Sequence, residues 1–178
     1  MSHKSKPVPG HEGVFVRNAT NADGDALRKL VFGVLEEHGL QPDPCGTDAD
    51  LGNLEAAYAK GCMNVLEAGG VVIGSAALLP HDAGTMELRK LYLAEPWRGR
   101  GLGKFLIEHA LAQAHARGAR RVVLETAAAL ENANRLYARF GFRPSTHAPA
   151  TPRADRAMEL DLPPAVPSCQ GRAGELSA

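Results

Sequence analysis

The segment that most constrains the fold is RGRGLGK, residues 98–104, in which three glycines and three cationic side chains fall within seven residues. It follows ELRKLYLAEPW, which has the pattern of a strand, and it precedes FLIEHALAQAHARG, which has the spacing of a helix. Glycines between a strand and a helix often form an ordinary turn. They also let successive main-chain amides point at one spot, with the positive end of the helix behind them. The segment therefore favours an anion such as a pyrophosphate.

Two familiar phosphate-binding loops do not fit this segment. With Gly103 and Lys104 as the Gly-Lys pair of a Walker A motif, the first glycine position is Arg98 and the Ser/Thr position is Phe105. A dinucleotide-binding G-x-G-x-x-G that began at Gly99 would place its third glycine at Lys104. Both motifs are excluded, so the segment belongs to another kind of loop.

The rest of the chain alternates strand and helix patterns. We predict strands at 14–17, 63–68, 70–80, 85–94, 120–127 and 157–162, and helices at 18–39, 47–61, 101–118 and 130–141. The three strands between 63 and 94 are separated by short turns and form an antiparallel meander. This order predicts a single α+β domain with a mixed central sheet over residues 13–162. Residues 1–12 are expected to form a flexible arm, and residues 163–178 a disordered tail.

The composition and the spacing of particular residues argue against several classes of function. The 20 Lys and Arg residues balance the 20 Asp and Glu residues, which argues against nucleic acid or a membrane as a partner. The three cysteines are widely spaced with no C-x-x-C, and no H-E-x-x-H occurs, so no metal site is expected. The N-terminus lacks the apolar run of a signal peptide, and no stretch reaches the length of a membrane span. We expect a soluble, cytoplasmic protein.

Two motifs carry a family resemblance. LRKLYLAEPWRGRGLGKFLIEHAL resembles the cofactor motif of the GNAT superfamily of N-acyltransferases, [Gln/Arg]-x-x-Gly-x-[Gly/Ala], with Arg98, Gly101 and Gly103 at its defined positions. ANRLYARFGFRP resembles the A-x-x-L-Y-x-x-x-G-F signature of the same family, and one helix and one strand separate the two motifs as they do in that family. The resemblance covers residues 14–162. It implies the GNAT acyl-CoA N-acyltransferase fold, with acetyl-CoA as co-substrate.

The resemblance also implies where the cofactor lies. In this family it wedges between two parallel strands that splay apart, here 87–93 and 122–126. Main-chain groups of the first strand would hold the pantetheine, and the glycine-rich segment would hold the pyrophosphate. The implied cofactor residues are Leu91, Tyr92, Leu93, Arg98, Gly99, Arg100, Gly101, Leu102, Gly103 and Lys104. The family often has an asparagine seven residues before the signature tyrosine. That position is Leu130 here, so we expect Asn132 or Asn134 to compensate.

Acetylation of an amine raises two proton problems. An alkyl ammonium has a pKa of about 10 and must lose a proton before it attacks, and the leaving thiolate benefits from receiving one. Tyr137 occupies the signature tyrosine, which in the family points at the thioester sulfur, so it is the predicted acid. Without the family pattern, the position of Tyr137 on an amphipathic helix would favour a core tyrosine.

Two glutamates are candidates for the base. Glu87 and Glu125 match positions that different family members use for a catalytic glutamate. Each could instead be a strand-face carboxylate paired with Arg89 or Arg121, and a chain of water molecules could serve as the base. Strand alternation predicts that Glu87, Arg89 and Leu91 share one face.

The resulting hypothesis is an acetyl-CoA-dependent N-acetyltransferase that acts on the primary amine of a small molecule by direct attack in a ternary complex. The acceptor side of this fold would hold a mixture of charges, which suits an amino-acid-like molecule. The residues expected there are Asp43, Asp48, Glu55, Tyr58, His147, Arg153, Asp155 and Arg156. A non-catalytic acyl-CoA-binding or sensing domain and a protein acetyltransferase are the alternatives, and a homodimer is left open.

Overall fold

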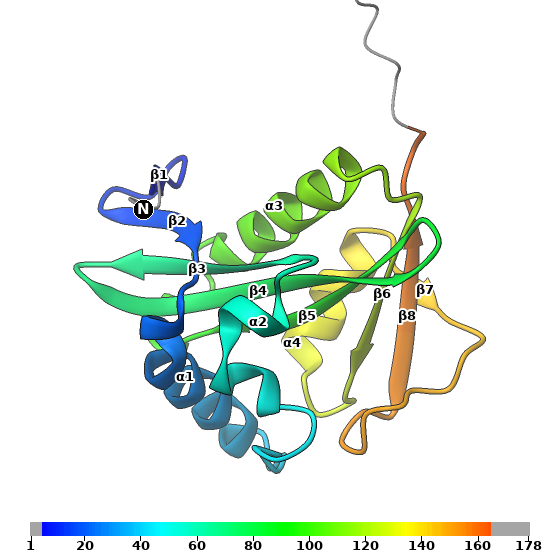
Figure 1. Ribbon diagram of the computed structural model, residues 1–178, viewed down its shortest axis with the longest axis horizontal. Coiled ribbons are helices and arrows are strands. Elements are labelled where there is room, and N and C mark those ends of the chain that lie inside the picture. The colour runs from blue at the N-terminus through cyan, green and yellow to red at the C-terminus, as the bar shows by residue number, and fades with distance from the viewer. Residues whose placement is uncertain (1–4, 165–178) are drawn as a thin grey trace, which may run out of the picture.

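The computed structural model describes residues 5–164 of the chain and is built on one eight-stranded sheet (Figure 1). The strands are β1 (Lys6–Pro7), β2 (Val14–Asn18), β3 (Cys62–Ala68), β4 (Val71–Asp82), β5 (Thr85–Leu93), β6 (Arg121–Thr126), β7 (Arg143–Pro144) and β8 (Arg156–Asp161). Their order in the sheet is β1-β2-β3-β4-β5-β6-β8-β7. Every neighbouring pair is antiparallel except β5 and β6, which are parallel. The predicted α+β domain with a mixed central sheet is confirmed.

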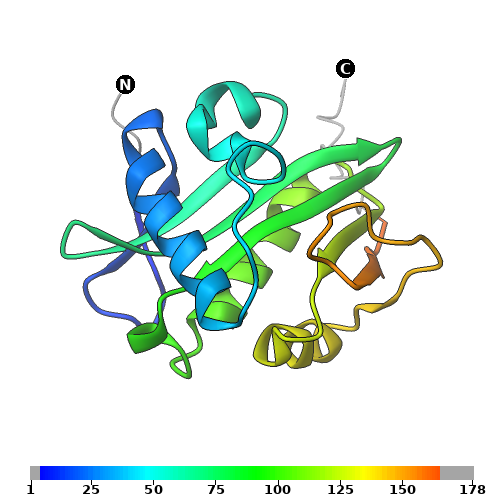
Figure 2. The same ribbon diagram turned by 90° about the horizontal axis from the view of Figure 1, so that it is seen from below.

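Helices cover both faces of the sheet (Figures 1 and 2). They are α1 (Gly24–Glu37), α2 (Leu54–Ala57), α3 (Leu102–Ala116) and α4 (Glu131–Arg139). One apolar cluster joins α1 and α2 to the sheet through buried side chains such as Leu27 and Leu54. A larger cluster joins α3 and α4 to the opposite face through side chains such as Leu106 and Tyr137. Within residues 5–164, no helix is both long and apolar enough to cross a bilayer.

The predicted helix over 47–61 is broken. It consists of a 3₁₀ turn at Ala49–Gly52 and the short helix α2, and between them Asn53 has non-helical backbone angles, with φ at −148° and ψ at 86°. The Asn53 side chain accepts a hydrogen bond from the Ala56 amide at 3.1 Å and so starts a new helix. Polar side chains that bond to nearby main-chain groups compete with helix continuation, which accounts for the break.

Part of the predicted N-terminal arm is described by the structure. Residues 6–7 form β1, which pairs with β2, and Val8 is buried in the core at 2% exposure. The structure therefore places this part against the edge of the sheet. Residues 1–4, and the predicted tail from residue 165 onward, lie outside the described residues.

The parallel pair β5 and β6 is joined only at its start. Register partners run from Thr85 opposite Arg121 to Glu87 opposite Val123, and no further pairs follow. Beyond Glu87 the two strands part, as the family resemblance implied. The gap opens toward the N-terminus of α3 and toward α4.

A β-bulge lies in β5 at this opening. Between the pairs Ser75–Tyr92 and Ala77–Arg89, β4 contributes one residue while β5 contributes Lys90 and Leu91. Lys90 has a φ of 51°, which residues other than glycine rarely adopt. The Ser75 hydroxyl donates a hydrogen bond of 2.7 Å to the Lys90 carbonyl.

The bulge corrects one prediction about the faces of this strand. Leu91 packs into the cluster below α3, whereas Tyr92 packs into the cluster below α1. The expectation that Leu91 shares a face with Glu87 and Arg89 is wrong, because the extra residue shifts the alternation by one. Tyr92 takes that place instead.

Candidate active site

A groove of about 800 Å³ begins at the opening between β5 and β6. Its walls come from the end of β5, the glycine-rich segment, the first turns of α3, and α4. The predicted cofactor residues that line it are Leu91, Tyr92, Leu93, Arg98, Gly99, Gly101, Gly103, Lys104 and Asn132. The structure thus brings together in one groove most of the cofactor set implied by the resemblance.

The glycine-rich corner is shaped by left-handed backbone. Gly99 and Gly101 have φ values of 72° and 88°, which glycine adopts without strain. Gly101 caps α3, and among residues 5–164 no side chain bonds to the amides of its first turn. Unpaired amides at the start of a 15-residue helix attract an anion. This geometry fits the predicted pyrophosphate site.

Arg98 does not serve as a free cation in this groove. Its two terminal nitrogens bind the Glu37 carboxylate at 2.5 and 2.8 Å, and its Nε donates to the Leu93 carbonyl at 2.9 Å. Glu37 holds the pKa of Arg98 above its ordinary value. Arg98 therefore ties the glycine corner to α1 and to the end of β5, and its charge is largely compensated.

Three other predicted cofactor residues do not line the groove with their side chains. Arg100 lies over the Trp97 ring, 5.2 Å from its centroid, and Leu102 is fully buried in the core. The Asn134 amide group donates to the Ala127 carbonyl at 2.9 Å and turns toward the end of β6. Of the two asparagines expected to compensate for Leu130, only Asn132 lines the groove.

Two cationic residues of the groove were missed by the sequence analysis. Arg135 and Arg139 on α4 line it together with Lys104. Among residues 5–164 the only carboxylate in the lining is Glu108, which pairs with Lys104 at 3.6 Å. Their i, i+4 spacing places both arginines on one face of the helix, which is a signal that the sequence contains. The groove is therefore positively charged along its α4 wall as well as at the glycine corner.

Tyr137 lies in the core at 6% exposure and lines neither the groove nor the pocket described below. Its ring packs edge-on against Phe142, with centroids 5.8 Å apart. Burial, and secondarily the neighbouring Tyr92, raise the pKa of Tyr137 well above the ordinary range. The phenol is therefore protonated at neutral pH, which is the state that a proton donor needs.

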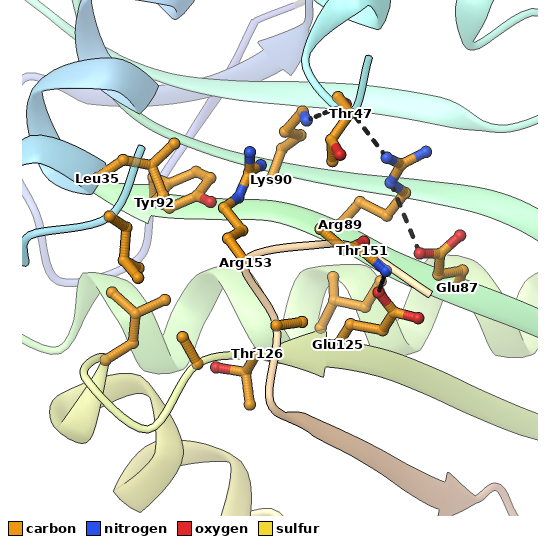
Figure 3. Close-up of a pocket in the computed structure, with 15 residues that line it drawn as sticks. Leu35, Thr47, Glu87, Arg89, Lys90, Tyr92, Glu125, Thr126, Thr151 and Arg153 are labelled. Carbon is orange, nitrogen blue, oxygen red and sulfur yellow. Dashed lines mark hydrogen bonds and ion pairs between the residues drawn. The ribbon is translucent and has the colours of Figure 1, made fainter. Parts of the chain in front are cut away.

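A second, smaller cavity of about 60 Å³, hereafter the inner pocket, adjoins the groove (Figure 3). Tyr92 and Leu130 line both spaces, so the two meet at the opening between the strands. The charged side chains around the inner pocket come from β5, β6 and the segment before β8. They are Glu87, Arg89, Lys90, Glu125 and Arg153.

The two candidate bases differ in how their carboxylates are engaged. Glu125 accepts hydrogen bonds from the amides of Ala150 and Thr151 at 2.6 and 2.9 Å. These bonds outweigh burial and lower the pKa of Glu125. Among residues 5–164, Glu87 makes no side-chain hydrogen bond, and its ion pair with Arg89 Nε is 3.6 Å long. Burial raises the pKa of Glu87, which brings it closer to the range that suits a general base.

Beside the inner pocket lies a buried group of charges. Asp48, whose side chain is fully buried, accepts two bonds from Arg153 at 2.7 and 2.8 Å and one from Lys90 at 2.7 Å. Lys90 Nζ also donates to the Thr47 carbonyl at 2.9 Å. These bonds join the β5 bulge, the segment after α1 and the segment before β8. They fix three walls of the pocket relative to one another.

Most residues expected on the acceptor side do not reach the inner pocket. Arg153 lines it and Asp48 supports it, but the others fold their polar groups elsewhere. Asp43 closes its own turn, Tyr58 is a core residue that donates to Asp50, and Asp155 accepts from the Ala128 amide. Glu55, His147 and Arg156 are also absent from the lining.

The family can now be assigned. The sequence model of the GNAT acetyltransferase family matches residues 33–142. YjgM of Escherichia coli (strain K12), an uncharacterized N-acetyltransferase, is 34% identical over 134 residues, which cover 71% of this chain and 80% of its own. The N-acetylaspartate synthetase of Danio rerio is 34% identical over 120 residues, or 65% of this chain and 40% of the synthetase.

A solved structure confirms the fold. The acetyltransferase yncA of Salmonella typhimurium, determined with acetyl-CoA, superposes with a TM-score of 0.66 at 21% identity, over 85% of this chain and 95% of its own. The chain belongs to the GNAT acetyltransferase family. It is therefore an acyltransferase, and acetyl-CoA is the acetyl donor used by this family.

Proposed function

We propose that the protein transfers the acetyl group of acetyl-CoA to the primary amine of a small molecule. The observation that carries this proposal is the meeting of two spaces at Tyr92 and Leu130, one a long cationic groove and the other a small pocket with ionisable walls. The groove suits a polyanionic cofactor, and the pocket suits an acceptor that reaches its thioester. The relative from Danio rerio is named for the product of acetylating an amino acid, which supports a small amine.

The cofactor is proposed to bind through its phosphates and its pantetheine arm. Amides of residues 99–104 would hold the diphosphate, assisted by Lys104, Arg135 and Arg139 on the groove walls. The arm would lie along the end of β5, where β6 has separated and leaves main-chain groups for an added strand. This route leads the thioester to the bulge in β5.

The reaction needs one base and one acid. We assign Glu87 as the base, because it has a raised pKa and an uncommitted carboxylate next to the inner pocket. The deprotonated amine attacks the thioester carbonyl carbon and forms a tetrahedral intermediate. As the carbon–sulfur bond breaks, the sulfur takes a proton from Tyr137, the acid implied by the family resemblance, whose buried phenol neighbours Tyr92, a residue that lines both spaces. The products are the acetamide and free CoA.

Turnover of acetyl-CoA tests this function. Free thiol released by the purified protein is measured with a panel of small amines and with no amine added. Amine-dependent thiol release is the expected result. Tight acetyl-CoA binding without turnover for any amine would instead assign the chain as a sensing domain.

Tyr137→Phe should lower kcat by about 100-fold, which is within the range that general acid catalysis contributes. The affinity for acetyl-CoA should stay unchanged, because the phenol does not line the groove. Thiol release and calorimetry on the same preparation measure the two quantities. An unaltered kcat would remove Tyr137 from the mechanism.

Glu87→Gln should lower kcat/KM by about 100-fold at neutral pH. In a profile of kcat/KM against pH, the variant should also lose the acidic limb, which is the decline toward low pH. In the native protein kcat/KM should fall as the pH drops through the raised pKa of Glu87, since protonation removes the base. The matched control is Glu125→Gln, in which two main-chain donors lose a charged acceptor. This control should raise the KM of the acceptor but keep the acidic limb. The opposite pattern would make Glu125 the base.

A further inference from the structure

We infer that the acceptor is an α-amino acid, whose carboxylate is bound by Arg89 while its amine is received by Glu87. This assignment rests on the proposed function and adds to it the chemical class of the acceptor and a residue that selects it. It follows from sorting the charged groups of the inner pocket by the bonds that they already make.

Two of the three cations around the inner pocket are committed to protein partners. Arg153 holds both oxygens of Asp48, and Lys90 is bound to Asp48 and to the Thr47 carbonyl. The Lys90 side chain is only 2% exposed, so it has little access to a ligand. Neither group can take a carboxylate from an acceptor without giving up a buried charge pair.

Arg89 is bound to other protein groups much more weakly than Lys90 and Arg153 are. Within residues 5–164 its guanidinium makes one hydrogen bond, from Nη2 to the Thr47 carbonyl, and that bond is long at 3.4 Å. Its contact with Glu87 is 3.6 Å, beyond hydrogen-bond length. A guanidinium carries five donors in a planar fork that matches a carboxylate with two parallel bonds. Arg89 therefore has unused donors at the wall of the pocket, where Figure 3 shows its two long contacts, with Thr47 and with Glu87.

The two carboxylates of the inner pocket also differ in how strongly they are bonded to protein groups. Glu125 accepts bonds from two main-chain amides, whereas within the described part of the chain Glu87 has only the long contact with Arg89. One uncommitted anion and one uncommitted cation remain, and they stand two residues apart on one face of β5. Side chains at that spacing leave a strand about 7 Å apart. The charged ends of the two side chains nevertheless approach to 3.6 Å, and an α-amino acid, whose amine and carboxylate are joined through one carbon, presents the complementary pair of charges at that closer separation.

The remaining lining agrees with a small zwitterion. Leu35, Leu40 and Leu130 supply apolar surface around the two charges. An amine without a carboxylate would leave Arg89 half-buried and unpaired beside the ammonium, which is unfavourable. The pocket should therefore discriminate against simple amines by charge as well as by shape.

The test compares amino acids with matched molecules that lack the carboxylate. The twenty α-amino acids, their α-amides and the corresponding decarboxylated amines are assayed for amine-dependent thiol release. The native protein should prefer its best amino acid over the matched amide by about 100-fold in kcat/KM, the scale set by leaving one member of a charge pair unpartnered. In Arg89→Gln this preference should fall below about 5-fold, through loss of activity on the amino acid alone.

Two further variants keep the result interpretable. Arg89→Lys retains the charge without the fork and should recover part of the preference, which a purely structural role for Arg89 would not produce. Arg121→Gln is the control, because Arg121 is exposed and pairs with Asp161 away from the pocket. It should retain the native preference.

The outcomes separate this inference from the function on which it rests. If amides and simple amines are acetylated as well as amino acids, the role of Arg89 is overturned while the acetyltransferase assignment stands. The same conclusion holds if Arg89→Gln keeps the preference. If no amine releases thiol although acetyl-CoA binds, the proposed function itself fails.

Discussion

Gly101→Glu is expected to weaken the binding of acetyl-CoA by at least about 100-fold, since it combines two separate penalties. Gly101 has a φ of 88°, and a non-glycine residue in that region costs about 1–2 kcal/mol. A carboxylate at the start of α3 would also repel the diphosphate from the helix end that attracts it. Steric exclusion adds little, because the closest atom to an added Cβ is His11 Nε2 at 3.8 Å.

Two alanine variants separate these penalties. Gly101→Ala introduces the backbone strain without the charge and should lose less affinity than Gly101→Glu. Gly118→Ala introduces comparable strain after the other end of α3, where φ is 76° and nothing lies within 4 Å of the added atom. It should bind acetyl-CoA normally. Calorimetry with acetyl-CoA measures all three, and a Gly101→Glu affinity within a few-fold of native would place the diphosphate elsewhere.

The main elements of this fold follow from local sequence patterns. The alternation in β3, β4 and β5 and the helical spacing of α3 can be recognised within windows of ten to twenty residues. The glycine corner was equally readable, since Gly99 and Gly101 adopt backbone angles that suit glycine. Those two features were enough to predict the sheet and the glycine corner, whereas the splayed strands and most of the groove lining were implied by the family resemblance.

Other parts of the site depend on contacts that local patterns do not encode. The bulge at Lys90 has no glycine or asparagine to mark it, and it exists because of pairing with β4 and bonds to Asp48. Arg98 looked like a free cation, but its partner Glu37 lies 61 residues earlier in the chain. Asp48 was expected among the charges that line the acceptor side and is instead fully buried beside the inner pocket. Each case required knowing which distant residues the fold brings together.

Asp48→Asn should have the largest effect on stability, lowering the free energy of unfolding by about 3–5 kcal/mol, the cost of removing one partner from a buried charge group. The substitution would leave Arg153 without its carboxylate partner, and Lys90 with only its longer 3.3 Å contact to Asp50 among residues 5–164. Chemical denaturation measures the change. Asp25→Asn is the control, because Asp25 is 95% exposed and pairs with Arg28 one turn along α1, so its effect should be near zero.

The pH dependence of unfolding gives a second, independent measure of the same charge group. Burial alone would raise the pKa of Asp48. Bonds from Arg153 and Lys90 outweigh burial and lower this pKa to about 2, below the value of 3.8 for a free aspartate. A lowered pKa means that the unfolded chain binds a proton more readily, so this contribution is complete above about pH 4 and disappears as the pH falls to about 2. The stability difference between the native protein and Asp48→Asn should shrink across that interval. A difference that stayed constant from pH 5 to pH 2 would show that Asp48 is not held ionised by the two buried cations.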